Sequence, residues 1–70
     1  MKTLHISKGY RIDTVTGHQE VVAQYGEACY IVHNYDENEH YTHASYLTDR
    51  EILHAERDLT GKVYDTVVYD

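Results

Sequence analysis

Alternating apolar and polar residues dominate the first third of the chain and predict short β-strands. In residues 3–8 and 10–15 the apolar pairs Leu4/Ile6 and Tyr10/Ile12 alternate with polar residues, as in a strand with one buried face. Residues 19–25 contain two adjacent valines between glycines, and we interpret this run as a third strand. The pair Thr16-Gly17 indicates a tight turn between the second and third strands. The pattern therefore predicts a run of β-hairpins.

Three later segments also have the character of strands. Residues 28–33, ACYIVH, are apolar on both faces, which is typical of a central strand. Residues 40–47 and 63–69 are rich in aromatic and β-branched side chains. Residues 34–39, NYDENE, are polar and rich in turn-forming residues, so we expect a loop there.

One helix is predicted over residues 49–59, because both of its ends are marked. Thr48 followed three residues later by Glu51 is a capping box, in which each side chain bonds the backbone N–H of the other residue. Gly61 supplies the left-handed residue that commonly ends a helix. At 100° per residue, one side of this helix is apolar and suits packing on a sheet. That stripe consists of Ile52, Ala55 and Leu59, with Leu53 at its margin.

These elements together predict an α+β fold. We expect a mainly antiparallel sheet of five to six short strands in meander order, one helix over 49–59, a final strand, and the helix packed on one face. A small, partly open β-barrel capped by the helix is the alternative. Residues 1–70 make a single domain, since the chain has no room for a second.

The aromatic residues are all tyrosines: the chain has eight Tyr, no Phe and no Trp. Each tyrosine carries a ring that packs and a hydroxyl that needs water or a partner. The usage therefore has two interpretations. One is a thin core whose rings stay half-exposed, and the other is a contact face rich in tyrosine, the kind of residue that interfaces favour.

Three histidines close to the acidic loop are the candidate metal ligands. His40 and His43 stand three residues apart, a spacing that points to opposite faces in a strand. His33 and His43 are able to share a face across the loop, depending on the register. We expect no metal site and no cofactor. A histidine-based metal-binding or pH-responsive protein is the alternative function.

No catalytic motif emerges, so we expect a protein that is not an enzyme. Cys29 lies within an apolar run, where a free cysteine packs as a small apolar residue. The four glycines are scattered at turns and do not form a phosphate-binding loop. A single cysteine excludes an intramolecular disulfide. No apolar stretch reaches membrane-spanning or signal-peptide character, and we expect a cytoplasmic location without membrane contact.

The excess of negative over positive charge lies entirely in the second half of the chain. Residues 1–34 carry three acids and three bases, whereas residues 35–70 carry nine acids and three bases, so the second half holds the whole net charge of −6. No basic stripe is present, which disfavours direct binding to nucleic acid. The charge is either a solubilising surface or a face that meets a larger protein with a basic surface.

These observations favour a small acidic, non-enzymatic binding module that modulates or inhibits a larger protein, basic or nucleic-acid-binding, by occupying its nucleic-acid site as a mimic. Compact acidic chains of this kind are common among inhibitors encoded by phages and mobile elements. We also expect a possible homodimer, because one helix cannot cover both faces of the apolar strands. The expected partner-binding residues are Tyr35, Asp36, Glu37, Glu39, Tyr41, Glu51 and Asp58.

Overall fold

The computed structural model describes all of residues 1–70 and has the predicted α+β fold, with six strands and one helix. The strands are Thr3–Ile6 (β1), Arg11–Thr14 (β2), Gly17–Gln24 (β3), Cys29–Asp36 (β4), Tyr41–Thr48 (β5) and Thr66–Tyr69 (β6), and the helix is Asp49–Thr60 (α1). Each of the six predicted strands is present. The last one begins three residues later than predicted. β4 continues to Asp36, so the first three residues of the segment 34–39, predicted to be a loop, belong to a strand.

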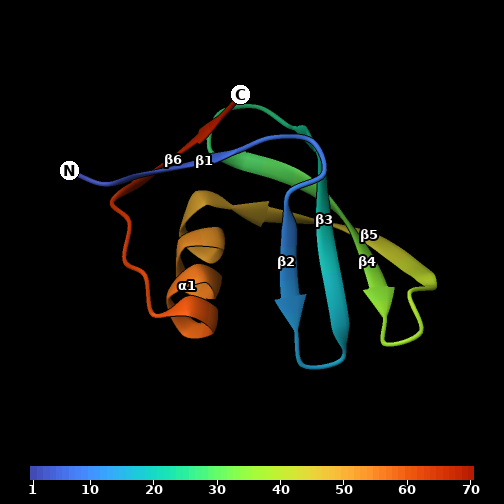
Figure 1. Ribbon diagram of the computed structural model, residues 1–70. Coiled ribbons are helices and arrows are strands. Elements are labelled where there is room, and N and C mark those ends of the chain that lie inside the picture. Colours follow the sequence, from blue (N-terminus) through green and yellow to red (C-terminus); the bar gives the residue numbers. More distant parts are fainter.

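The strands form two sheets that do not close into a barrel. β2, β3, β4 and β5 make a four-stranded antiparallel meander in that order, and β1 pairs with β6 in parallel (Figure 1). The expectation that the first strand continues the run of hairpins is therefore wrong. β1 passes over the end of the meander and lies beside the last strand, with Leu4 opposite Val67, and both side chains are buried. Apolar alternation indicates which face of a strand is buried but does not indicate its neighbour.

The hairpin between β2 and β3 turns through Val15 and Thr16, one residue earlier than predicted. Thr14 pairs with Gly17, which begins β3 with a φ of 156°. A Cβ atom at this glycine would overlap the backbone carbonyl oxygen of Tyr35. Gly17 is thus required by the close approach of β4 rather than by the turn itself.

Both predicted ends of α1 are confirmed. The Thr48 hydroxyl accepts from the Glu51 N–H at 3.3 Å, and the Glu51 carboxylate accepts from the Thr48 N–H at 3.1 Å. Gly61 has a φ of 75° and donates its N–H to the carbonyl oxygen of Arg57. The helix therefore begins and ends where its own sequence places it.

The core lies between α1, one face of the meander and the β1–β6 pair. Ile52 is the buried residue of the helix, and Leu53 and Ala55 pack beside it. Leu59, which the helical period placed in the same stripe, is 49% exposed. It occupies the last turn, beyond the residues that form the core, and periodicity does not indicate where packing stops. The sheet and the β1–β6 pair contribute Leu4, Ile6, Ile12, Val21, Tyr30, Val32 and Val67.

The molecule is thin, with extents of 37 × 27 × 15 Å. A single helix packs against a four-stranded sheet, so the sheet has one covered and one uncovered face (Figure 1). No helix of the structure has the length and apolar character needed to cross a membrane.

Candidate functional site on the open face of the sheet

The face of the meander opposite α1 carries a set of aromatic side chains. Val21 and Val32 are buried under the helix, so residues three positions away, such as His18 and Tyr35, point to the other side. The register confirms this placement. His18 pairs with Tyr35, and Tyr35 pairs with Tyr41 across β3, β4 and β5. We call this side of the sheet the open face.

Four rings on the open face form a connected cluster. His18 stacks on Tyr35 with a centroid separation of 4.8 Å and an interplanar angle of 10°. Tyr41 meets Tyr35 at 6.0 Å and His33 at 5.1 Å, each time edge-on. His18 is 8% exposed beneath its neighbours, whereas Tyr41 is 54% exposed. The cluster therefore has a buried base and an accessible rim.

Two further tyrosines extend the aromatic surface toward the opposite end of β5. Tyr25 and Tyr46 contact each other with centroids 5.4 Å apart, and both are exposed. Tyr46 pairs with Ile31 of β4, which is half-buried. The open face thus combines large apolar rings with hydroxyl groups that water or a partner can bind.

The acidic segment formed by Asp36, at the end of β4, and the loop that follows adjoins this cluster and has one hydrogen-bonded and two free carboxylates. The Asp36 carboxylate accepts from the N–H groups of His40 and Asn38, each at 2.9 Å. These bonds, that of His40 first, hold the pKa of Asp36 below its usual range. Glu37 and Glu39 are exposed and form no salt bridge or hydrogen bond through their side chains. Asp36 therefore holds the loop, and the two glutamates present its charge.

A shallow hollow joins the loop to the ring cluster. Its lining combines Arg11, Gly17 and His18 with Asp36 at the end of β4 and the loop residues 37–39, and it contains no apolar side chain. Arg11, the one base in this lining, is paired with Asp13 at 2.8 Å, whereas the lining contains three acids. The hollow is consequently a polar, net negative rim beside the aromatic rings.

The seven predicted partner-binding residues do not share one surface. The structure brings Tyr35, Asp36, Glu37, Glu39 and Tyr41 together at one end of the open face. Glu51 and Asp58 lie instead on α1, beside Gln19 and Leu47 on the helix-covered side of the sheet. Both helix acids already have partners, because Glu51 completes the capping box and Asp58 lies 3.1 Å from His54.

Sequence reasoning missed His18 and His33 as members of the aromatic cluster. The signal for their position is the alternation within β3 and β4, which becomes informative only once the pairing of Gln19 with Asn34 fixes the register. The excess of acids in residues 35–70 does not indicate that the rings of His18 and His33 contact Tyr35 and Tyr41.

The three candidate histidine ligands do not converge. His33 pairs with Ala44 and the adjacent Asn34 pairs with His43, so His33 and His43 point to opposite faces of the sheet. The expectation that they can share a face is wrong. No group of three or more His, Cys, Asp or Glu side chains is arranged to hold a metal ion. Cys29 is half-buried as a free thiol.

The fold and this surface define the class of protein: a small α+β domain with one sheet face covered by a helix and the other open, aromatic and bordered by acids. No protein-family model, curated protein or solved structure matches the chain.

Proposed function

We propose that this chain is a small acidic, non-enzymatic binding module that modulates a larger protein through the open face. The observation that carries the proposal is the ring cluster around Tyr35 and Tyr41, which no element covers and which adjoins the unpaired carboxylates of Glu37 and Glu39. Exposed tyrosine rings provide the desolvated anchors of protein interfaces, and nearby charges steer the encounter. The two features occur together at one end of the sheet.

A partner with a basic surface fits this arrangement best. The loop acids stand at the rim of the rings, and the chain as a whole has a net charge of −6. A basic groove that normally binds nucleic acid would meet negative charge and stacking surfaces in the same contact. The module would then inhibit such a partner by occupying that groove.

Direct binding of nucleic acid is the competing interpretation, because aromatic sheet faces also stack single-stranded bases. Proteins that do so combine the rings with a positively charged groove that follows the phosphates. Here Glu20 lies on the same face, opposite His33, and Arg11 is paired with Asp13. Phosphates would therefore be repelled where the bases stack, and the charge favours a protein partner.

Intrinsic tyrosine fluorescence tests this proposal, because the chain contains no tryptophan. A lysine- and arginine-rich peptide without aromatic residues is titrated into the protein. We expect saturable quenching that weakens as salt shortens the Debye length from ~10 Å at 0.1 M to ~3 Å at 1 M. Tyr41→Ala and the double variant Glu37→Lys/Glu39→Lys should each weaken binding strongly.

The matched control is Glu27→Lys/Asp70→Lys, which makes the same charge change at exposed sites outside the acidic loop. Equal losses of peptide affinity in both double variants would mean that Glu37 and Glu39 contribute only to general solubility. A single-stranded oligonucleotide that binds as tightly as the basic peptide would overturn the choice of partner. Asp36 is left unchanged in these variants, because its carboxylate holds the loop.

We also propose that a second copy pairs along β5. This strand is an edge of the meander, and residues 41–48 contain no Lys, Arg, Asp, Glu or Pro to discourage pairing. In a chain of net charge −6, such a neutral edge lets two copies approach without like-charge contact. Antiparallel pairing centred on Ser45 places Ala44 of one copy beside Tyr46 of the other, so a small and a large side chain meet.

A further inference from the structure

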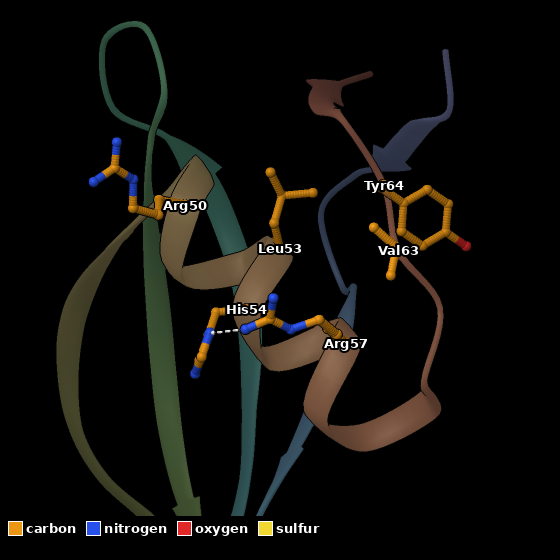
Figure 2. A pocket seen from close by; sticks show the side chains of 6 residues that line it. All are labelled: Arg50, Leu53, His54, Arg57, Val63 and Tyr64. Carbon is orange, nitrogen blue, oxygen red and sulfur yellow. Dashed lines mark hydrogen bonds between the residues drawn. The ribbon is translucent and has the colours of Figure 1, made fainter.

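A second hollow lies on the other side of the molecule, between α1 and the segment that leads to β6. Figure 2 shows Arg50, Leu53, His54 and Arg57 along α1, with Val63 and Tyr64 on the segment facing the helix. Half of this lining is apolar, and the other half carries cationic or imidazole groups. The hollow shares no residue with the open face.

The arginines of this hollow have no carboxylate partner. Three of the four acids on α1 are engaged elsewhere: Glu51 caps the helix, Glu56 accepts from the Tyr10 hydroxyl, and Asp58 pairs with His54. The fourth, Asp49, forms no salt bridge with either arginine. Neither Arg50 nor Arg57 forms a salt bridge. The sequence makes this half of the chain strongly acidic, yet the structure leaves two guanidinium groups without a carboxylate partner on one side of the helix.

Arg57 is held in place rather than free in solvent. Its guanidinium donates to Nδ1 of His54 at 3.0 Å, and Nε2 of the same ring lies 3.1 Å from an Asp58 oxygen (Figure 2). A neutral His54 ring with its proton on Nε2 satisfies both contacts, accepting from Arg57 and donating to Asp58. Because this bond already orders the Arg57 side chain, binding a ligand costs less conformational entropy. The guanidinium also keeps further N–H groups that can donate to a ligand.

We propose that this hollow binds a small oxyanion, a carboxylate or a phosphate, carried on an apolar group. A planar guanidinium binds both anions through two parallel hydrogen bonds, which makes Arg57 the primary contact. Arg50 lies seven residues earlier, roughly 10 Å along the helix axis, and adds a second positive charge at the other end of the hollow. Leu53 and Val63 form the apolar walls that receive the body of the ligand, and Tyr64, whose ring points away from α1, borders the hollow (Figure 2).

Phenyl phosphate is the test probe, compared with benzoate and with inorganic phosphate. Two-dimensional NMR follows the side-chain N–H signals of the arginines and the backbone signals of residues 63 and 64. We expect saturable shifts at Arg57, Arg50 and Tyr64 with phenyl phosphate and benzoate. Inorganic phosphate, which lacks the apolar group, should bind more weakly at the same residues.

Arg57→Gln should weaken binding of phenyl phosphate roughly ten- to a hundredfold, and Arg50→Gln should have a smaller effect. Arg11→Gln is the matched control, because Arg11 is paired with Asp13 and lies outside this hollow. Circular dichroism establishes that each variant is folded. Unchanged affinity in Arg57→Gln, or shifts that do not saturate, would overturn the proposal. Equal losses in Arg57→Gln and Arg11→Gln would show general attraction of anions and would overturn it as well.

The same oxyanion can come from a free small molecule or from a modified side chain. A short phosphotyrosine peptide is therefore compared with phenyl phosphate. Distinctly tighter binding of the peptide assigns the source to a phosphorylated protein, and equal binding assigns it to a small molecule. Glu37→Lys/Glu39→Lys should leave both affinities unchanged, so this site and the open face are tested independently.

Discussion

Two buried or half-buried tyrosines lie close to acids of the helix. The Tyr10 hydroxyl donates to the Glu56 carboxylate. Burial, then this bond, raises the pKa of Tyr10 far above its ordinary value. Tyr30 is 1% exposed, and burial, together with the nearby Asp49 carboxylate, raises its pKa in the same direction. Both side chains must stay neutral in the folded protein.

Stability should therefore fall in alkali. An unfolded tyrosine ionises near pH 10, whereas the folded Tyr10 and Tyr30 remain protonated to higher pH. Their contribution to the free energy of unfolding is fully present below about pH 10 and is lost as the pH rises above it. Urea unfolding across that range measures the loss. Tyr10→Phe should make the free energy of unfolding less dependent on pH, whereas Tyr25→Phe, at an exposed ring, should not. If both variants showed the same dependence on pH, the role given to Tyr10 would be wrong.

The stabilising contribution of the Asp36 carboxylate should depend on pH in the acid range, and it concerns the loop that this carboxylate holds. Its lowered pKa means that the ionised carboxylate is favoured in the folded loop. The contribution is present above the unfolded pKa of about 3.9 and is lost as the pH falls through the lower, folded value. Asp36→Ala should speed hydrogen exchange at the amides of Asn38 and His40 near neutral pH. Glu37→Ala serves as the control, and equal effects would mean that Asp36 has no special role.

At the scale of the element, α1 depends on its cap and on one buried side chain. Thr48→Ala removes the capping hydroxyl and should cost about 1 kcal/mol of unfolding free energy. Ile52→Ala empties a fully buried site and should cost about 2–5 kcal/mol. Leu59→Ala deletes the same kind of apolar side chain at a half-exposed position and should cost much less. Chemical denaturation measures all three, and a severe Leu59→Ala would show that the last turn is packed.

Across the whole molecule, the neutral edge of β5 should determine the oligomeric state. We expect sedimentation equilibrium to show a dimer of the 8.2 kDa chain at micromolar concentration. Ala44→Lys places two like charges close together in the paired edge and should yield monomers. Thr14→Lys puts the same charge on β2, the opposite edge of the sheet, and should leave the dimer intact. If the unmodified protein is a monomer at this concentration, the proposed β5 interface does not form.

Local sequence patterns determined the elements of this protein. Thr48, Glu51 and Gly61 fixed the limits of α1, because capping bonds join residues only a few positions apart. Alternation of apolar and polar residues likewise located β1 and β2, since the period of side chains along a strand is a property of the backbone. Runs of β-branched, aromatic or apolar residues located the other four strands. The charge count also located the acidic loop, where Glu37 and Glu39 are exposed as expected.

Tertiary structure alone decided which residues meet. Only the register shows that His18 stacks on Tyr35 and that His33 and His43 point apart, because a shift of one residue reverses every face. Only packing shows that Leu59 is half-exposed and that β1 lies beside β6. The sequence by itself therefore determined the helix, the strands and the distribution of charge, which depend on neighbours along the chain. The open face and the hollow lined by Arg50 and Arg57 depend on contacts between distant segments of the chain. Only the folded structure establishes those contacts.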